Sequence, residues 1–480
     1  MTRLVVIGDA LLDVDVVGVA RRLSPDAPVP VLDDIVEHPR PGGAALAAVM
    51  AANDGHDVTL VTAVGDDDDG RRLQGLLGGV TVVALPYTGP TPVKRRVRSA
   101  GQSLVRLDSG STPGEVTDLP AAVATALSRA DCVLVSDYGR GVSALPALRN
   151  LLQSLPASVP LVWDPHPRGA DPVPGCRLVT PNRSEAAAFA QRPEPSRGSA
   201  GSQLADTQAD AVALVHGWQA RAVAVTLGSR GALLTYGSGA PSVSPAPSVH
   251  CIDPCGAGDR FAVTAVLELA RDRLPSEAVA AAVLSASAYV AQGGPAGLFA
   301  SSYPHDDGAP GAAGRVPAAD VSALLDGVRA GGGTVVAAGG CFDLLHAGHI
   351  ATLQSARSLG DCLVVCLNSD ASVRRLKGPQ RPLVRQADRA RVLNALECVD
   401  AVVVFDEDTP AQILDRLRPH IWVKGGDYAG VDVPEAAVLE RWGGQVVTLS
   451  YLPGHSTSQL ASAAAGSKPT VVHEIEEMQP

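Results

Sequence analysis

The heptapeptide at residues 253–259 reads Asp-Pro-Cys-Gly-Ala-Gly-Asp and stands directly before a predicted helix over residues 260–270. Two glycines at a helix start let backbone N–H groups point at an anion, and the helix dipole favours negative charge there. A carboxylate at this place can accept a proton from an attacking hydroxyl during phosphoryl transfer. A glycine-rich helix start with an aspartate cap explains the same residues. The expected phosphoryl-transfer residues are Gly256, Ala257, Gly258 and Asp259.

Around this motif, short β-branched runs alternate with alanine- and leucine-rich stretches over about the first 292 residues. Buried parallel strands have this composition, and strands that alternate with helices form right-handed βαβ units. We expect an α/β fold with strands over residues 4–7, 58–61, 132–136, 161–164 and 222–226. The expected helices cover residues 44–52, 119–127, 260–270 and 277–291.

The alternation stops and then restarts further along the chain. Residues 293–317 are rich in Gly, Pro and Ala without periodicity, which is typical of a linker. New strands are expected over residues 334–338, 362–367, 401–405, 421–423 and 445–449. The predicted organisation is a first domain (1–300), a linker with a leading helix (301–333), a second domain (334–460) and a disordered tail (461–480).

Composition narrows the function. A formal net charge of −11 argues against nucleic acid as a main partner, because phosphate backbones need a basic surface. No apolar run approaches the roughly 20 residues of a membrane span, so no membrane partner is expected. Eight cysteines without a CxxC pair predict free thiols and a cytoplasmic location.

Several motifs of the first domain, taken in their order, resemble the ribokinase-like (PfkB) sugar kinases. They are Asp9 and Asp13 after the first strand, Pro41-Gly42-Gly43, Thr180-Pro181-Asn182-Arg183-Ser184-Glu185, Thr226-Leu227-Gly228-Ser229-Arg230-Gly231, and the heptapeptide. The resemblance implies a ribokinase-like fold with a small β lid and Asp259 as the catalytic base. It implies sugar binding by Asp9, Asp13, Gly42 and Gly43. It implies binding of nucleotide and Mg²⁺ around Asn182, Glu185, Thr226, Gly228 and Gly231.

Three further segments resemble the heptose 7-phosphate kinases more narrowly: residues 22–31, 104–108 and 136–141. This likeness adds Arg106 and Asp137 to the expected substrate-binding residues, although Arg106 is also compatible with a surface ion pair. The proline-rich run 22–31 fits an edge strand or a lid loop. Leu46, Pro254 and Cys255 depart from the family's pattern. If Leu46 faces a sugar hydroxyl, Leu46→Asn should tighten substrate binding or leave it unchanged.

The second domain opens with Gly339-Gly340-Cys341-Phe342-Asp343-Leu344-Leu345-His346-Ala347-Gly348-His349, directly after a predicted strand. His346 and His349 are three residues apart at a helix start, so they face the same side. Imidazoles at the positive end of a helix suit the charge that develops on an α-phosphate. Zinc is the alternative ligand, but Cys341 and Asp343 complete no obvious tetrahedral set, so no metal site is expected.

This string resembles the HxGH nucleotidyltransferases of the cytidylyltransferase-like group, which implies a Rossmann-like domain. The resemblance implies catalytic roles for His346, His349 and Lys377. It implies nucleotide binding by Cys341, Phe342, Asn368, Lys424, Gly425, Asp427, Ser456 and Thr457.

The two domains in this order resemble the bifunctional heptose enzymes of ADP-heptose synthesis. The implied reactions are phosphorylation of heptose 7-phosphate at C1 and transfer of AMP from ATP to heptose 1-phosphate. ATP is the expected co-substrate, Mg²⁺ the cofactor, and a homodimer the expected assembly. Two alternatives stay open: another sugar-phosphate kinase fused to a cytidylyltransferase-type domain, or a degenerate sugar-phosphate-binding domain joined to an active nucleotidyltransferase.

Overall fold

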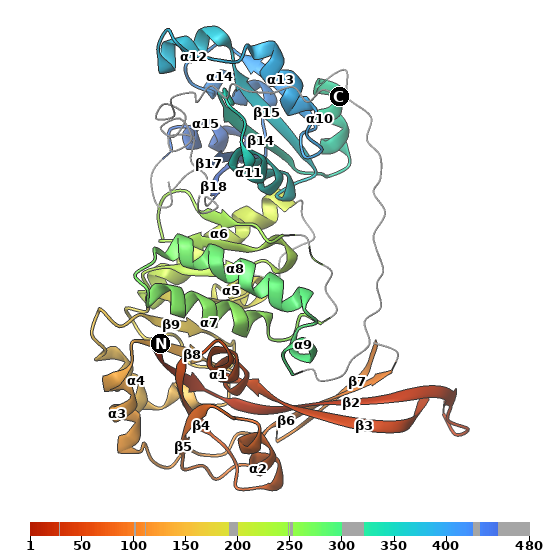
Figure 1. Ribbon diagram of the computed structural model, residues 1–480, viewed down its shortest axis with the longest axis vertical. Coiled ribbons are helices and arrows are strands. Elements are labelled where there is room, and N and C mark those ends of the chain that lie inside the picture. The colour runs from red at the N-terminus through yellow and green to blue at the C-terminus, as the bar shows by residue number, and fades with distance from the viewer. Residues whose placement is uncertain are drawn as a thin grey trace, which may run out of the picture. The chain divides into compact units, whose positions relative to one another are not determined.

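A computed structural model describes residues 1–27, 29–99, 102–110, 112–191, 200–247, 249, 253–299, 321–425 and 433–449. The chain forms two compact units that divide within residues 300–320. They are called the N-terminal and C-terminal units below, and each is described by itself (Figure 1).

The N-terminal unit is built on one large sheet in which the strand order is β5-β4-β1-β8-β9-β10-β11-β12-β13. The pairs from β5 to β11 are parallel, and β12 and β13 add antiparallel pairs. The strands are β1 (Arg3–Gly8), β4 (Asp57–Ala63), β5 (Val80–Leu85), β8 (Cys132–Ser136), β9 (Leu161–Asp164), β10 (Leu178–Val179), β11 (Val223–Thr226), β12 (Ala232–Thr235) and β13 (Ser242–Ser244). The mostly parallel α/β sheet predicted from the sequence is therefore confirmed.

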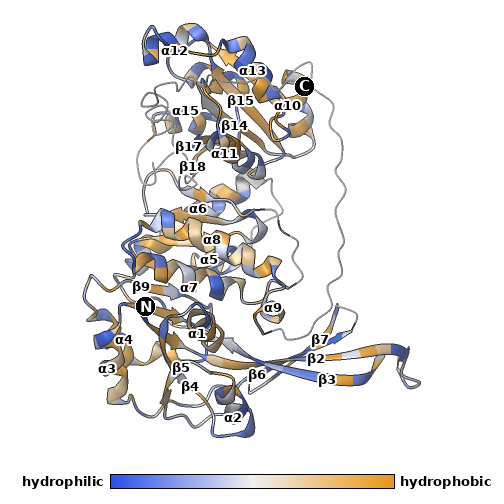
Figure 2. Ribbon diagram, in the orientation of Figure 1, coloured by the Kyte–Doolittle hydropathy of each residue, from blue (hydrophilic) through white to orange (hydrophobic). Residues whose placement is uncertain are grey.

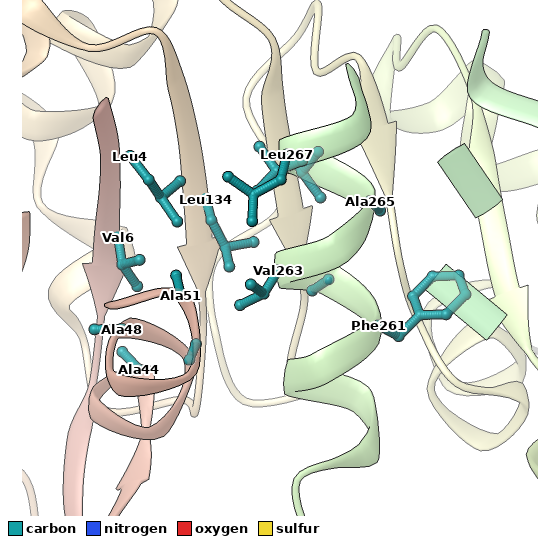
Figure 3. Packing of buried hydrophobic residues seen from close by; sticks show 14 of the residues in the cluster. Leu4, Val6, Ala44, Ala48, Ala51, Leu134, Phe261, Val263, Ala265 and Leu267 are labelled. Carbon is teal, nitrogen blue, oxygen red and sulfur yellow. The ribbon is translucent and has the colours of Figure 1, made fainter. Parts of the chain in front are cut away.

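One face of this sheet is covered by α1 (Ala44–Asn53), α7 (Ala257–Leu269) and α8 (Pro275–Ala291). Figure 3 shows alanines of α1 and the apolar side of α7 meeting alternate side chains of β1 and β8; the labelled residues are Leu4, Val6, Ala44, Ala48, Ala51, Leu134, Phe261, Val263, Ala265 and Leu267. Successive strand residues point to opposite faces, so Val5 and Ile7 are buried on the other side. The remaining helices of the unit are α2 (Asp68–Gly75), α3 (Ala121–Arg129), α4 (Pro146–Gln153), α5 (Arg183–Phe189), α6 (Ala200–Trp218) and α9 (Pro295–Phe299), with short 3₁₀ turns η1 (Val142–Ala144) and η2 (Gly228–Arg230).

A second sheet of four strands, in the order β3-β2-β6-β7, forms the lid. Its strands are β2 (Ala10–Leu23), β3 (Pro30–Gly43), β6 (Val93–Ser99) and β7 (Gln102–Ser109). The proline-rich run leads into β3, an edge strand, where a missing N–H costs no ladder bond. Only Asp9 separates β1 from β2, so the lid grows directly out of the main sheet.

The C-terminal unit has a parallel sheet in the order β16-β15-β14-β17-β18. Its strands are β14 (Val335–Gly340), β15 (Cys362–Asn368), β16 (Ala401–Phe405), β17 (Ile421–Gly425) and β18 (Gln445–Leu449). The hydrophobic colour of β14 and β15 in Figure 2 fits strands buried on both faces. The strand order reverses at β14, and in open α/β sheets the ligand crevice lies at such a point. The helices are α10 (Val321–Ala330), α11 (Ala347–Ser358), α12 (Asp370–Lys377), α13 (Gln386–Asn394), α14 (Ala411–Leu417) and α15 (Ala436–Leu439), followed by the 3₁₀ turn η3 (Glu440–Trp442).

The stretch expected to be a linker differs at its start, because Pro295–Phe299 form α9 after the tight turn at Gly293 and Gly294. Most of the predicted linker and the whole predicted tail lie outside the described residues. Among the helices that the structure describes, none has the length and apolar character needed to cross a membrane.

Candidate functional sites

Asp259 lies in the first turn of α7 and is 5% exposed. The Tyr138 hydroxyl, in the loop after β8, donates to its carboxylate at 2.9 Å from each oxygen. Burial raises the pKa of Asp259 to about 7, the Tyr138 hydrogen bond opposes this rise, and Asp13 adds to it. A carboxyl group with this pKa is suited to take a proton near neutral pH.

The glycine-rich loop owes its shape to Gly256, the N-cap of α7, which has a φ of 79°. A Cβ there would stand 2.7 Å from the Tyr289 hydroxyl and 2.8 Å from Leu46, so a side chain is excluded. The Ala257 N–H donates to the Pro254 carbonyl at 3.1 Å and closes the turn. At Gly258 a Cβ would meet open space. Of the expected anion-binding residues, Gly258 therefore has free room in front of it.

Leu46 does not fit the expectation that it faces a sugar hydroxyl. It is 1% exposed and packs with Met50, Tyr289 and Val290 in a small cluster under the glycine-rich loop. The expectation that Leu46 faces a sugar hydroxyl is therefore wrong. Leu46→Asn is now expected to destabilise the unit, because an asparagine would bury an amide in an apolar cluster. Leu46 supports the loop from below.

Two of the expected sugar-binding carboxylates are occupied by backbone N–H groups. Asp9 accepts from Tyr138 at 3.0 Å, Arg140 at 2.9 Å and Val142 at 3.3 Å. Asp137 accepts from the Gly139 N–H at 2.7 Å and the Ser143 hydroxyl at 2.6 Å, and burial raises its pKa to about 6. Both carboxylates thus fix the loop that carries Tyr138.

Asp13 is the expected substrate residue that faces a cluster of cations. Its carboxylate lies 3.3 Å from Arg96 and 3.9 Å from Arg40. A Cβ at Gly42 would come within 2.9 Å of it, so Gly42 leaves room for this carboxylate. Gly43 has a φ of 59° and turns the chain from β3 into α1.

Arg40 comes from β3, and the other cations come from one face of β6; none of them was predicted from the sequence. Lys94, Arg96 and Arg98 alternate along the strand. Lys94 lies 5.3 Å from the Tyr138 ring centroid, Arg96 lies 3.5 Å from the Cys255 sulfur, and Arg98 pairs with Asp253 at 3.2 Å. The period-two spacing Lys-x-Arg-x-Arg is a strand signal that would have placed these three side chains together.

Arg106 lies opposite Arg96 in the β6–β7 register, so it shares that face of the lid. Its side chain is exposed and pairs with Asp108 at 3.0 Å. The structure therefore places Arg106 at the open margin of the lid rather than beside Asp259.

The expected nucleotide residues of the N-terminal unit meet at the ends of β10 and β11. Asn182 caps α5 and exchanges hydrogen bonds with Glu185 at 3.0 and 2.8 Å. Asn182 forms a parallel bridge with Thr226 at the end of β11. An open cavity of about 460 Å³ lies here, lined by Asn182, Arg183, Ser184, Gln203, Thr226, Leu227, Gly228 and Arg230.

Two arginines of this cavity were not among the predicted residues. Arg183 and Arg230 both donate to the Gln203 side-chain oxygen, at 2.8 and 3.3 Å. The pKa of Arg230 is lowered by burial and by Arg183, which marks two cations held close together. Gly231 is required by its φ of 94° and by a contact of 2.0 Å that a Cβ would make with Ser244; it shapes the loop behind the cavity.

In the C-terminal unit a cavity of about 470 Å³ lies at the end of β14, where the strand order reverses. It is lined by Ala338, Gly339, Gly340, Cys341, Phe342, Asp343, Leu344, His346, Gly348, His349, Thr352, Leu353, Lys377, Arg381, Val423 and Gly425. Four of the residues expected at this site from the sequence line it with both histidines: Cys341, Phe342, Lys377 and Gly425. Gly348, between the histidines, lines it as well.

The two histidine rings lie 4.0 Å apart between centroids. His346 is the N-cap of α11, and its Nδ1 accepts from the Gly348 N–H at 3.1 Å. Burial, His346 and Lys377 lower the pKa of His349 to about 4. His349 is therefore neutral at neutral pH and can act as a hydrogen-bond donor rather than as a cation.

Buried charges hold the loops around this cavity. Asp343 accepts from Arg381 at 2.6 Å and from the Leu383 and Val384 N–H groups. Arg389, 1% exposed, pairs with Asp370 at 2.7 Å and donates to the Cys341 and Asn368 carbonyls.

Two predicted nucleotide residues lie behind the lining of the cavity. Asn368 is buried, donates to Ser372 at 3.0 Å and accepts from the Cys341 thiol at 3.8 Å. Lys424 pairs with Glu435 at 3.0 Å. Asp427, Ser456 and Thr457 lie outside the described residues.

Comparisons with known proteins agree with this division. Residues 1–299 match the family model described as pfkB family carbohydrate kinase, and residues 337–459 match the model described as cytidylyltransferase-like. The chain is 55% identical over 469 residues to the bifunctional protein HldE of Streptomyces coelicolor, covering 97% of this chain and 98% of that protein. It is 36% identical to the bifunctional protein HldE of Pelobacter propionicus, covering 95% and 94%. A solved phosphofructokinase-2 from Escherichia coli covers 62% of this chain and 97% of its own, at 20% identity and a TM-score of 0.46.

The chain matches two catalytic domain families and aligns with bifunctional relatives over nearly their whole length, which favours neither alternative, that is, neither another sugar-phosphate kinase fused to a cytidylyltransferase-type domain nor a degenerate sugar-phosphate-binding domain joined to an active nucleotidyltransferase. The chain belongs to the family of the bifunctional HldE proteins, and it is a carbohydrate kinase and a nucleotidyltransferase in one polypeptide.

Proposed function

We propose that the N-terminal unit transfers the γ-phosphoryl group of ATP to the C1 hydroxyl of D-glycero-β-D-manno-heptose 7-phosphate. The observation that carries this assignment is Asp259, buried at the start of α7 with a pKa of about 7 beside the open room at Gly258. Asp259 takes the proton of the attacking hydroxyl. The cations on β6 suit a substrate that already carries a phosphate.

ATP belongs in the cavity at the ends of β10 and β11, where Arg183 and Arg230 add positive charge. Mg²⁺ usually keeps several waters and binds through one or two carboxylates and the substrate's phosphates. Glu185 fits this need, because the Asn182 N–H occupies one of its oxygens and the other stays available. The ion would supply charge neutralisation on the phosphates. Among the described residues, no three His, Cys, Asp or Glu side chains are grouped to hold an ion without such a nucleotide.

The C-terminal unit then transfers AMP from ATP to heptose 1-phosphate, with release of pyrophosphate. The attacking group is a phosphate monoester, which is already an anion and needs no protein base. His346, His349 and Lys377 line the cavity and can donate to the phosphate oxygens as charge develops. A separate phosphatase must remove the 7-phosphate between the two reactions.

The test is to incubate the full chain with ATP, Mg²⁺ and a panel of sugar phosphates and to identify the products by phosphorus NMR and mass spectrometry. Heptose 7-phosphate should give the 1,7-bisphosphate, while fructose 6-phosphate should react far more slowly. Heptose 1-phosphate should give ADP-heptose with ATP and little product with CTP. Equal turnover of fructose 6-phosphate, or equal use of CTP, would contradict the assignment.

We further propose a cytoplasmic homodimer. Several apolar side chains on the lid strands are more than two-fifths exposed, namely Val19, Ile35, Val36, Leu104, Val105 and Leu107. Exposed apolar side chains gathered on one sheet are typical of an interface. The cysteines that the structure describes are free thiols, which suits a reducing compartment. Light scattering should give twice the chain mass, and Ile35→Asp with Val36→Asp should give monomers; an unchanged mass in that variant would exclude the lid as the interface.

A further inference from the structure

One side chain in contact with the kinase base has no role in the chemistry described above. The Tyr138 hydroxyl has a single proton, and it lies 2.9 Å from both Asp259 oxygens. This geometry is a shared donation along the axis of the carboxylate. It holds the carboxylate in one orientation.

Tyr138 is itself fixed from two sides. Its backbone N–H donates to Asp9 at 3.0 Å, at the junction between β1 and the lid. The ammonium group of Lys94, from β6, lies 5.3 Å from the ring centroid, within the range of a cation–π contact. Contacts with the main sheet and with the lid thus fix Tyr138, and the Tyr138 hydroxyl in turn orients Asp259 on α7.

We infer that Tyr138 is a positioning residue of the kinase reaction, whose hydroxyl orients Asp259 and favours its ionised form. This inference rests on the proposed role of Asp259 as the base. A hydrogen bond donated to a carboxylate stabilises the ionised state, whereas burial stabilises the neutral acid. In this site the two effects oppose each other, so the hydroxyl keeps the base usable near neutral pH.

Other groups face Asp259 from the surrounding elements and set the rest of its ionisation. Asp13 from β2 and Asp164 from β9 are acids that disfavour a further negative charge, and Lys94 from β6 favours it. The neighbouring polar and titratable groups are Ser136 from β8, Cys255 from the glycine-rich loop and Tyr289 from α8. The Tyr289 hydroxyl carries no charge between pH 5 and 9, because burial raises its pKa. All of them remain in place when the Tyr138 hydroxyl alone is removed.

The experiment measures kcat/KM for heptose 7-phosphate between pH 5 and 9 in the full chain, for the wild type and for Tyr138→Phe. The wild type should lose activity on the acid side with a midpoint near 7. Loss of a hydrogen bond to the ionised form should move this midpoint up by about one pH unit. Activity at pH 6 should then fall about tenfold, and activity at pH 9 should change little.

Tyr289→Phe is the matched control, because its hydroxyl donates to the Cys255 carbonyl at 3.0 Å in the same loop and not to Asp259. Its acid midpoint should equal that of the wild type. An unshifted midpoint in Tyr138→Phe, or an equal shift in both variants, overturns the inference. If Tyr138→Phe fails to fold by circular dichroism, a fluorotyrosine at position 138 decides the question. It keeps the shape and donates more strongly, so the midpoint should move down.

The proposed function and the inference fail in different ways. A wild-type chain that does not phosphorylate heptose 7-phosphate contradicts the proposed function. A wild-type chain that does so, with a midpoint that Tyr138→Phe leaves unmoved, contradicts only the role of Tyr138.

Discussion

In the two catalytic units burial shifts the pKa of a site residue in opposite directions. In the kinase unit burial raises the pKa of Asp259 to about 7, and in the transferase unit burial lowers that of His349 to about 4. In each case burial favours the neutral form. The difference follows the chemistry: a sugar hydroxyl must lose a proton to attack, whereas a sugar phosphate is already ionised. One unit therefore needs a base, and the other needs neutral hydrogen-bond donors.

The largest expected effect is the loss of the kinase activity when the base is removed, with the transferase activity retained. Asp259→Asn keeps the size of the side chain and removes the base, so phosphorylation of heptose 7-phosphate should fall by about 10²–10⁴-fold. Formation of ADP-heptose from supplied heptose 1-phosphate should stay near the wild-type rate. Two single-substrate assays on one preparation measure both. Equal loss of both activities in a folded protein would show that the units share a site or a conformational switch. It would contradict the conclusion that only the kinase unit needs a base.

The reverse experiment tests the histidine pair. His346→Ala should lower nucleotidyl transfer by about 10²–10³-fold, as the loss of one oxyanion donor does, and spare the kinase. His346 is also the N-cap of α11, so the loss has a structural component. His346→Asn separates the two, because asparagine is a good N-cap without the imidazole. Transfer restored by His346→Asn would show that the ring is needed only for the helix.

Substitutions of Leu46 test how much the packing under the glycine-rich loop contributes to the stability of the kinase unit. Leu46→Asn should destabilise the kinase unit by about 3 kcal/mol, because it buries an amide among Met50, Tyr289 and Val290. Leu46→Met nearly conserves volume and should cost less than about 1.5 kcal/mol. Denaturant titrations of the full chain, followed by kinase activity, give both values. A Leu46→Asn variant with normal stability and tighter sugar binding would instead support the original expectation that this position faces the substrate.

The smallest effect is the pH dependence of the two unmodified activities. Asp259 must be ionised to act, so the kinase rate should rise as the pH rises through about 7. His349 stays neutral until the pH falls towards 4, so the transferase rate should change little between pH 8 and pH 5. Rates measured on one preparation across this range should diverge by about tenfold at pH 6. Coinciding profiles would remove the distinction between base and donor.

The fold and the centre of each site could be predicted from the sequence, because both depend on local signals. Apolar runs located β1, β4, β8, β9 and β11 of the main N-terminal sheet and the C-terminal strands β14 to β18, but they missed β5, β10, β12 and β13. The Gly-Ala-Gly-Asp and HxGH strings located Asp259 and the histidines. The partners of these residues could not be predicted, because tertiary contacts decide them. The carboxylates of Asp9 and Asp137 accept hydrogen bonds from backbone N–H groups, and the ammonium group of Lys424 forms an ion pair with Glu435.

The lid shows the same limit. A β lid was predicted from the sequence, but not that β6 directs Arg96 and Arg98 onto the loop that carries Asp253 and Cys255. Those contacts join residues about 155 positions apart in the chain, and their pairing depends on where the lid folds over the sheet. The alternation of charge along β6 can be seen in the sequence, but the residues that these charges contact cannot.

The junction of the lid with the main sheet has a mechanical consequence. Strand β2 leaves the sheet at Asp9 and β3 returns at Gly43, and these two residues are in contact, since a Cβ on Gly43 would stand 2.4 Å from the Asp9 carbonyl. The β2–β3 hairpin joins the main sheet at this junction, and within the lid β2 pairs with β6 from Leu12 to Val17. Strand β2 has 14 residues, or roughly 45 Å at about 3.3 Å per residue. Asp13 lies four residues beyond Asp9 in this strand, so a rigid rotation about the junction would move the tip about three times as far as Asp13.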